Sequence, residues 1–288
     1  MSLGFACFNP GAQAQPATVP IAQEIMAKLA AKYAGLSNLV VTGRVIEDID
    51  MSGGKSSAAA PKTDELKYDL GKPGRVTTFS IRLAKPDFYR IEWSQRMSDS
   101  YTQKGAAWSS GSGDFLLLAD KKRRIQGGMD MTLASATGVS GGVASTLPPV
   151  FFQRQTNELQ SLGNLALLPE EKIGDDVCYV VSGDLNGQKL ILWITKDYWL
   201  KQKKMVLGAE MKMPEMSDED IKKALSATGQ PTTPEAISSM RETMKSVQAM
   251  SSKMKGSITE KYESFKANSS VTKESFDYES DSKSKTGN

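Results

Sequence analysis

The chain contains no histidine and only two cysteines, and each of these scarcities excludes a class of chemistry. Without imidazole, no Ser-His or Cys-His nucleophile pair can form, and His-ligated zinc is excluded. Cys7 lies in a segment that we interpret below as a processed leader, so Cys178 would be alone in the mature chain. Within the apolar run 177–181, Cys178 is predicted to be a small buried hydrophobe.

Pairs of neighbouring carboxylates remain as candidates for acid–base chemistry or metal binding, because two carboxylates can serve either purpose. Each pair lies near a predicted turn or helix start, where Asp commonly accepts hydrogen bonds from free backbone N–H groups. The pairs are Asp48/Asp50, Asp175/Asp176 and Asp218/Asp220. We therefore predict structural roles for them, and a protein that is not an enzyme, with no catalytic residue, metal site or cofactor.

The sequence also has little excess of either charge sign and no long hydrophobic run. The 36 basic and 33 acidic residues leave a net charge of +3, which is too balanced for a nucleic-acid partner. The basic run 121–124 is predicted to be a solvated hairpin. No stretch approaches the ~20 apolar residues that a membrane-spanning helix needs. The hydrophobic fraction of 39% nevertheless allows a sizeable core.

Residues 1–19 are predicted to be a signal-peptide remnant and linker. An apolar stretch at 5–8 precedes Ala12-Gln13-Ala14, which fits the small-x-small cleavage rule. A lipoprotein signal that ends at Cys7 is the alternative. Both interpretations predict export, so we expect a periplasmic protein that is either soluble or anchored as a lipoprotein.

Periodicity predicts an α+β fold built on a curved antiparallel sheet. Apolar residues recur every four positions over 20–35 and predict a helix with a core-facing stripe. Alternation and turn residues predict a first set of strands at 39–46, 65–70, 75–83, 89–93, 98–104, 106–109, 115–120 and 123–126. A second set is predicted at 165–168, 176–184, 189–195, 199–212, 257–265 and 270–278. Between the sets, small residues over 127–150 predict a short helix and a crossing loop, followed by a helix at 154–162.

A helical insertion at 214–256 is predicted within a single domain that spans 20–278, and the polar tail 279–288 is expected to be disordered. A capping box at 217–220 opens the first inserted helix, and Thr233-Pro234 opens the second. Met240, Met244 and Val247 lie near one face of that second helix. The stripe is either a permanent cover for the open end of the sheet or a mobile lid over an apolar groove.

Three segments resemble the periplasmic lipoprotein-carrier (LolA/LolB-like) superfamily, in particular its outlying families of uncharacterised exported proteins. They are 85–93 (Lys-Pro-Asp-Phe-Tyr-Arg-Ile-Glu-Trp), 190–197 (Leu-Ile-Leu-Trp-Ile-Thr-Lys-Asp) and 259–276. The resemblance implies a half-open β-barrel wrapped around the N-terminal helix, with lipid or acyl chains held on an apolar concave face. Family carriers also use an arginine in lipoprotein handover, for which Arg44 and Arg90 are the candidates.

These expectations lead to a non-catalytic periplasmic binding protein for a lipid, an acyl chain or a lipoprotein. The alternative is an envelope-sensing or protein-interaction module with a filled interior. Aromatic and aliphatic residues on the predicted strands are the candidate groove residues, with core packing as their default role. These residues are Phe79, Ile81, Tyr89, Ile91, Trp93 and Trp193.

Overall fold

The computed structural model describes residues 21–50, 75–96, 101–119, 121–208, 216–227, 230–251 and 255–278. The predicted leader at 1–19, the predicted strand at 65–70 and the tail at 279–288 lie outside the described residues.

Eleven strands among the described residues form one antiparallel sheet. Its order is β6-β5-β4-β3-β2-β1-β11-β10-β9-β8-β7. The first half comprises β1 (Asn38–Asp50), β2 (Arg75–Ala84), β3 (Phe88–Arg96), β4 (Thr102–Ser109), β5 (Asp114–Leu118) and β6 (Lys121–Ile125). The second half comprises β7 (Gly163–Ile173), β8 (Asp176–Leu185), β9 (Gln188–Thr195), β10 (Leu200–Leu207) and β11 (Lys255–Ala267).

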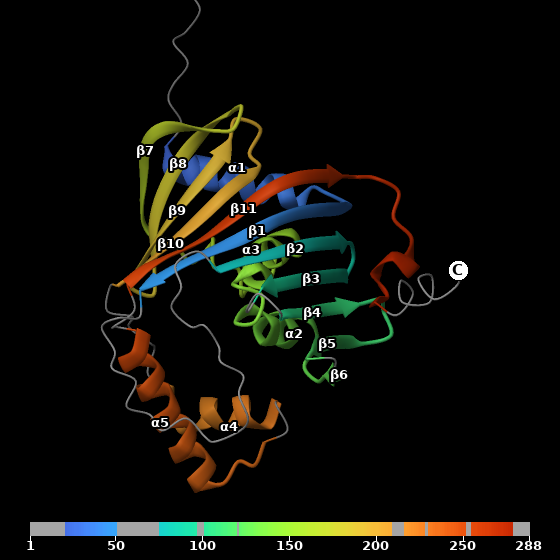
Figure 1. The fold of residues 1–288 in the computed structure, drawn as a ribbon, viewed down its shortest axis with the longest axis vertical. Helices are drawn as coiled ribbons and strands as arrows, with labels where there is room; N and C mark the ends of the chain where they lie inside the picture. Colours follow the sequence, from blue (N-terminus) through green and yellow to red (C-terminus); the bar gives the residue numbers. More distant parts are fainter. Residues whose placement is uncertain are drawn as a thin grey trace, which may run out of the picture.

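The path of the chain explains why the sheet is unclosed. Strands β1 to β6 run outward to one edge, and α2 (Gly128–Thr137) and α3 (Val143–Phe151) then carry the chain to the opposite edge, where β7 starts. Strands β7 to β11 return to the middle, where β11 pairs with β1. The helices lie on the concave side, and β6 and β7 form the two edges (Figure 1). The predicted α+β half-open barrel is confirmed.

Helix α1 (Ala22–Ala34) supplies the centre of the core. Its predicted stripe is confirmed, because Ile25, Leu29 and Tyr33 have no exposed surface and pack against the inward faces of the strands. Burial of each such side chain stabilises the fold by about 1.5–3 kcal/mol. The Tyr33 hydroxyl also accepts a hydrogen bond of 3.1 Å from the Leu200 backbone N–H, which ties α1 to the start of β10.

Strand β4 corrects one of the predictions, since two strands, at 98–104 and 106–109, were expected on either side of Gly105. The strand instead runs unbroken through that residue and pairs it with Trp93 on β3. The indole of Trp93 covers the position that a Cβ would take at Gly105. Glycine is therefore needed for the close approach of an aromatic ring rather than for a turn.

Gly105→Ala is expected to destabilise the protein by about 1–3 kcal/mol, because the added methyl group must displace a packed indole. Urea denaturation followed by tryptophan fluorescence measures this change. The control is Gly138→Ala, where a Cβ meets nothing within 4 Å and the backbone φ is −65°. We expect that control to be neutral or to stabilise by about 0.4–1 kcal/mol; equal effects at both positions would contradict the packing argument.

Three further elements differ from expectation. The small-residue segment forms two helices, α2 and α3, instead of one helix and a loop. Residues 154–162 form turns, not a helix, and the predicted strand at 270–278 is wrong because that segment holds the short 3-10 helix η1 (Lys273–Phe276). In the turns, the Asn157 side chain accepts a hydrogen bond of 3.0 Å from the Leu159 N–H. Such local side-chain bonds compete with helix formation.

Helices α4 (Asp218–Ala227) and α5 (Pro234–Ser251) form the inserted pair between β10 and β11. The Ser217 hydroxyl accepts a hydrogen bond from the Asp220 N–H, and Thr233 caps α5 in the same way, as the sequence predicts. The two helices bury Ile221, Leu225 and Ile237 against each other. They project away from the sheet (Figure 1).

Candidate functional site

An apolar pocket opens between α1, the end of α3 and the start of β7. Its volume is about 310 Å³, at the small end of the ~300–1,000 Å³ typical of ligand pockets. The apolar side chains that line it are Met26, Leu29, Ala30, Val150, Leu159, Leu162 and Leu165. Exposed Gln23, Ala27 and Gln160 also line it, so the pocket reaches the surface.

Helix geometry explains the α1 side of the pocket. Met26, Leu29 and Ala30 are three and four residues apart, so they project from one face of the helix. Leu29 is fully buried, whereas Ala30 is half-buried and small. The small side chain at position 30 leaves space that a larger residue would fill.

The opposite side of the pocket is a segment without helix or strand, residues 152–162, which we call the wall segment. Its turns are closed by backbone bonds from the Asn157 N–H to the Arg154 carbonyl and from the Gln160 N–H to the Asn157 carbonyl, both 3.2 Å. Leu159 and Leu162 are buried by this arrangement. This side of the pocket is therefore formed by a short irregular segment, whose position must be fixed by contacts with other elements.

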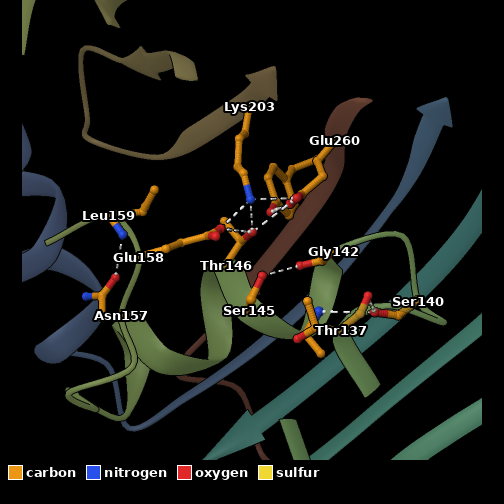
Figure 2. Close-up of polar contacts among 12 residues, drawn as sticks. Thr137, Ser140, Gly142, Ser145, Thr146, Asn157, Glu158, Leu159, Lys203 and Glu260 are labelled. Atoms are coloured by element: carbon orange, nitrogen blue, oxygen red, sulfur yellow. Dashed lines mark hydrogen bonds and ion pairs between the residues drawn. The ribbon is translucent and has the colours of Figure 1, made fainter. Parts of the chain in front are cut away.

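A buried ionic network provides that anchoring (Figure 2). The Lys203 ammonium on β10 lies 2.9 Å from the Glu260 carboxylate on β11 and forms a second ion pair with Glu158 of the wall segment. It also donates a hydrogen bond of 2.7 Å to the Thr146 hydroxyl on α3. The Tyr262 hydroxyl donates to the other oxygen of Glu260. The network thus joins the sheet, α3 and the wall segment.

Burial and charge act in opposite directions on Lys203. Its side chain is only 3% exposed, and burial alone would lower the pKa of the ammonium. Attraction to Glu260 and Glu158 outweighs burial and raises that pKa above its ordinary value. Burial, followed by the charge of Glu260, raises the pKa of the Tyr262 phenol. Lys203 is therefore charged and holds Glu158, between the pocket residues Asn157 and Leu159.

The predicted groove residues lie elsewhere in the molecule. Five of the six pack into the main core on the concave side, each no more than 5% exposed, and none lines the pocket between α1 and the wall segment. These five are Phe79, Ile81, Tyr89, Ile91 and Trp93. Trp193 is not brought together with them, because it packs with Cys178 and Val180 in a separate cluster. Cys178 is fully buried there, as predicted.

The predicted lid residues do not cover the concave face in this structure. Met240 packs against the small cluster formed by Ile221, Leu225 and Ile237 of the α4–α5 pair. Met244 is partly exposed, and Val247 lies in α5 with a side chain outside the described part of the structure. Of the α5 side chains that the structure describes, none lines the α1 pocket.

Neither candidate arginine faces that pocket. Arg44 is half exposed and pairs with Glu263 at 2.9 Å. Arg90 is only 2% exposed, donates to the Asp277 carbonyl and to Glu92, and lies against the ring of Tyr278. The C-terminal segment therefore buries Arg90 against the sheet.

Two kinds of feature, a membrane-spanning helix and a metal site, are not found among the described residues. No helix in the part that the structure describes is both long enough and apolar enough to cross a membrane. Within the same residues, no group of three or more Cys, Asp or Glu side chains is placed to hold a metal ion.

No protein-family model matches the sequence, and no curated protein matches it. Several solved structures are similar in outline. The Mycobacterium tuberculosis lipoprotein LppX is 11% identical with a TM-score of 0.35, over 87% of this chain and 98% of that chain. A putative outer membrane lipoprotein-sorting protein domain from Vibrio parahaemolyticus is 12% identical with a TM-score of 0.33, over 89% and 96%.

MucB in the Pseudomonas aeruginosa MucA/MucB complex is 8% identical with a TM-score of 0.37, over 89% of this chain and 60% of that chain. At such identities and TM-scores, the similarities support no inference about a ligand or a partner.

Proposed function

We propose that this chain is a non-catalytic binding protein of the bacterial cell envelope, in which the α1 pocket takes the end of an acyl chain from a lipid or a lipidated partner. The observation that supports the proposal is the lining of the pocket, which is formed mainly by aliphatic side chains and reaches the surface beside α1. Each CH₂ group that enters such a pocket stabilises the complex by ~0.8 kcal/mol.

The packing under the rest of the concave face favours binding of a short part of one acyl chain over binding of all the tails of a lipid. Helices α1, α2 and α3 fill the space under the sheet, and most inward residues of β1 to β3 have no exposed surface. A ligand therefore has room at the end of the barrel where α1 meets the wall segment. A second pocket among the described residues, of about 320 Å³ beside Phe79 and Trp93, is also lined by the charged residues Glu92 and Lys104 and suits an acyl chain less well.

Ala30→Trp tests the pocket directly, since the indole would occupy the space beside Met26 and Leu29. We expect the dissociation constant of a fluorescent fatty-acid probe to rise roughly tenfold or more. Ala31→Trp is the matched control, because position 31 is the next residue of the same helix but is exposed and outside the pocket. It should bind the probe as the wild type does. Equal binding by both variants, with unchanged circular dichroism, would reject the pocket as the binding site.

A protein-interaction module with a filled interior is the competing function, and the extensive packing under the sheet favours it. Native mass spectrometry of protein purified from its host separates the two. Co-purified lipid that is lost in Ala30→Trp supports the acyl-binding function, whereas a lipid-free mass with a bound protein supports the alternative.

A further inference from the structure

The two open edges of the sheet are built differently. The edge strand β7 contains Pro169, and its pairing with β8 shifts register twice, between Gly163 and Ala166 and between Leu168 and Glu171. Proline and bulges are common means of preventing an edge from pairing with another strand. The opposite edge strand, β6, contains no proline and pairs with β5 in unbroken register from Lys121 to Ile125. Its outer side is therefore a regular strand edge.

Strand β6 also carries four consecutive exposed cations, Lys121, Lys122, Arg123 and Arg124. Among the described residues, Lys121, Arg123 and Arg124 form no ion pair. Carboxylates on the elements next to β6 are already engaged. Asp114 of β5 accepts a hydrogen bond of 2.6 Å from the Tyr89 hydroxyl, and Asp130 of α2 accepts one of 2.8 Å from Arg154. Within the described part of the chain, the charges of Lys121, Arg123 and Arg124 are thus left without a partner carboxylate.

Two of the four cations are held in position by β5 and by the turn that precedes it. The Lys122 ammonium lies 4.7 Å from the centre of the Phe115 ring, and Arg124 donates to the Ser112 carbonyl at 3.4 Å. Because side chains alternate along a strand, Lys122 and Arg124 lie on one face of the edge, with Lys121 and Arg123 on the other. Cations therefore flank the edge on both faces of the sheet.

We propose that β6 is the docking site for an extended acidic segment of a partner protein, which adds to the sheet as a further strand. The backbone groups on the outer side of β6 supply the hydrogen bonds of strand addition, and Lys121, Arg123 and Arg124 select a segment with acidic side chains. The same cations exclude a second copy of this chain, because two β6 strands side by side would place like charges opposite one another. This site is separate from the α1 pocket and does not depend on it.

Fluorescence anisotropy with the full chain tests the proposal. The probe is a labelled peptide of about six residues in which Glu alternates with Val and Thr, and the comparison peptide has the same side chains but N-methyl groups on alternate backbone amides. We expect the unmethylated peptide to bind and the methylated one to bind roughly tenfold more weakly, since it cannot complete the strand ladder. Equal affinity for both peptides would overturn strand addition, because only charge attraction would then remain.

Two double variants test whether the peptide binds at β6. Lys121→Gln with Arg123→Gln should weaken binding of the unmethylated peptide roughly tenfold, whereas Lys222→Gln with Lys223→Gln, two exposed cations of α4, should leave it unchanged. Equal losses in the two double variants would overturn the assignment to β6. Sedimentation with phosphatidylglycerol vesicles tests whether β6 binds an anionic membrane surface instead. Vesicle binding that depends on Lys121 and Arg123, without binding of the peptide, would overturn the proposal in favour of a membrane surface.

Discussion

Lys203→Met is expected to destabilise the protein by about 3–5 kcal/mol, because it leaves two carboxyl groups in the interior without their cation. Glu260 is only 2% exposed, so water cannot replace the lost ammonium there, and the 14% exposure of Glu158 allows only partial hydration. Urea denaturation at neutral pH measures the loss. The wall segment should open as well, which hydrogen exchange at the amides of Asn157 and Leu159 reports.

The control for this prediction neutralises the whole network. Replacing a buried ion pair by neutral residues of similar size is often close to neutral in stability. The triple variant Lys203→Met, Glu158→Gln, Glu260→Gln is therefore expected to recover most of the loss seen in the single variant. A single variant that loses less than ~1 kcal/mol, or a triple variant that is less stable than it, would contradict the role assigned to the network.

Phe276→Ala is the second large effect, with an expected loss of about 3–5 kcal/mol of folding free energy. Phe276 is 2% exposed, and its ring centre lies 5.8 Å from that of Phe88 on β3. The residues on either side of it accept hydrogen bonds from the sheet, since the Ser275 carbonyl binds Arg82 and the Asp277 carbonyl binds Arg90. Loss of the ring should release this C-terminal segment from the sheet.

Thermal denaturation monitored by circular dichroism measures the Phe276→Ala effect. Val177→Ala serves as its control, because Val177 is 46% exposed and surface substitutions usually change stability by less than about 0.5 kcal/mol. If Phe276→Ala were as stable as Val177→Ala, the C-terminal segment would not be part of the packed fold.

The sequence predicted the sheet and α1 well because both depend on periodic burial. Alternation in β2 and the four-residue stripe of α1 each follow directly from one apolar face that is turned toward the core. Trp193 is a residue whose orientation periodicity could not predict. Residues 190–194 are all apolar, so alternation cannot tell which of them point inward, and Leu190, Leu192 and Ile194 prove to be the core residues.

The candidate site was harder to predict because its parts are far apart in sequence. Lys203 and Glu260 become neighbours only through the pairing of β10 with β11, and Glu158 joins them from an irregular segment. A charge at an inward position of a strand was the available signal, but residues 201–204 of β10 are three lysines and one glutamine. A register shift after Leu200 also obscures which face each of these side chains takes. Residues 154–162 of the wall segment were predicted as a helix because the local hydrogen bonds of Asn157 have no periodic signature.

X-ray diffraction tests most directly whether an acyl chain enters the pocket between α1 and the wall segment. Crystals grown with a fatty acid that carries bromine on its terminal carbon should show an anomalous peak among Met26, Leu159 and Leu162. The peak should be absent from crystals of Ala30→Trp. Bromine bound at another surface, or a pocket that stays empty of the chain at saturating ligand, would contradict the claim.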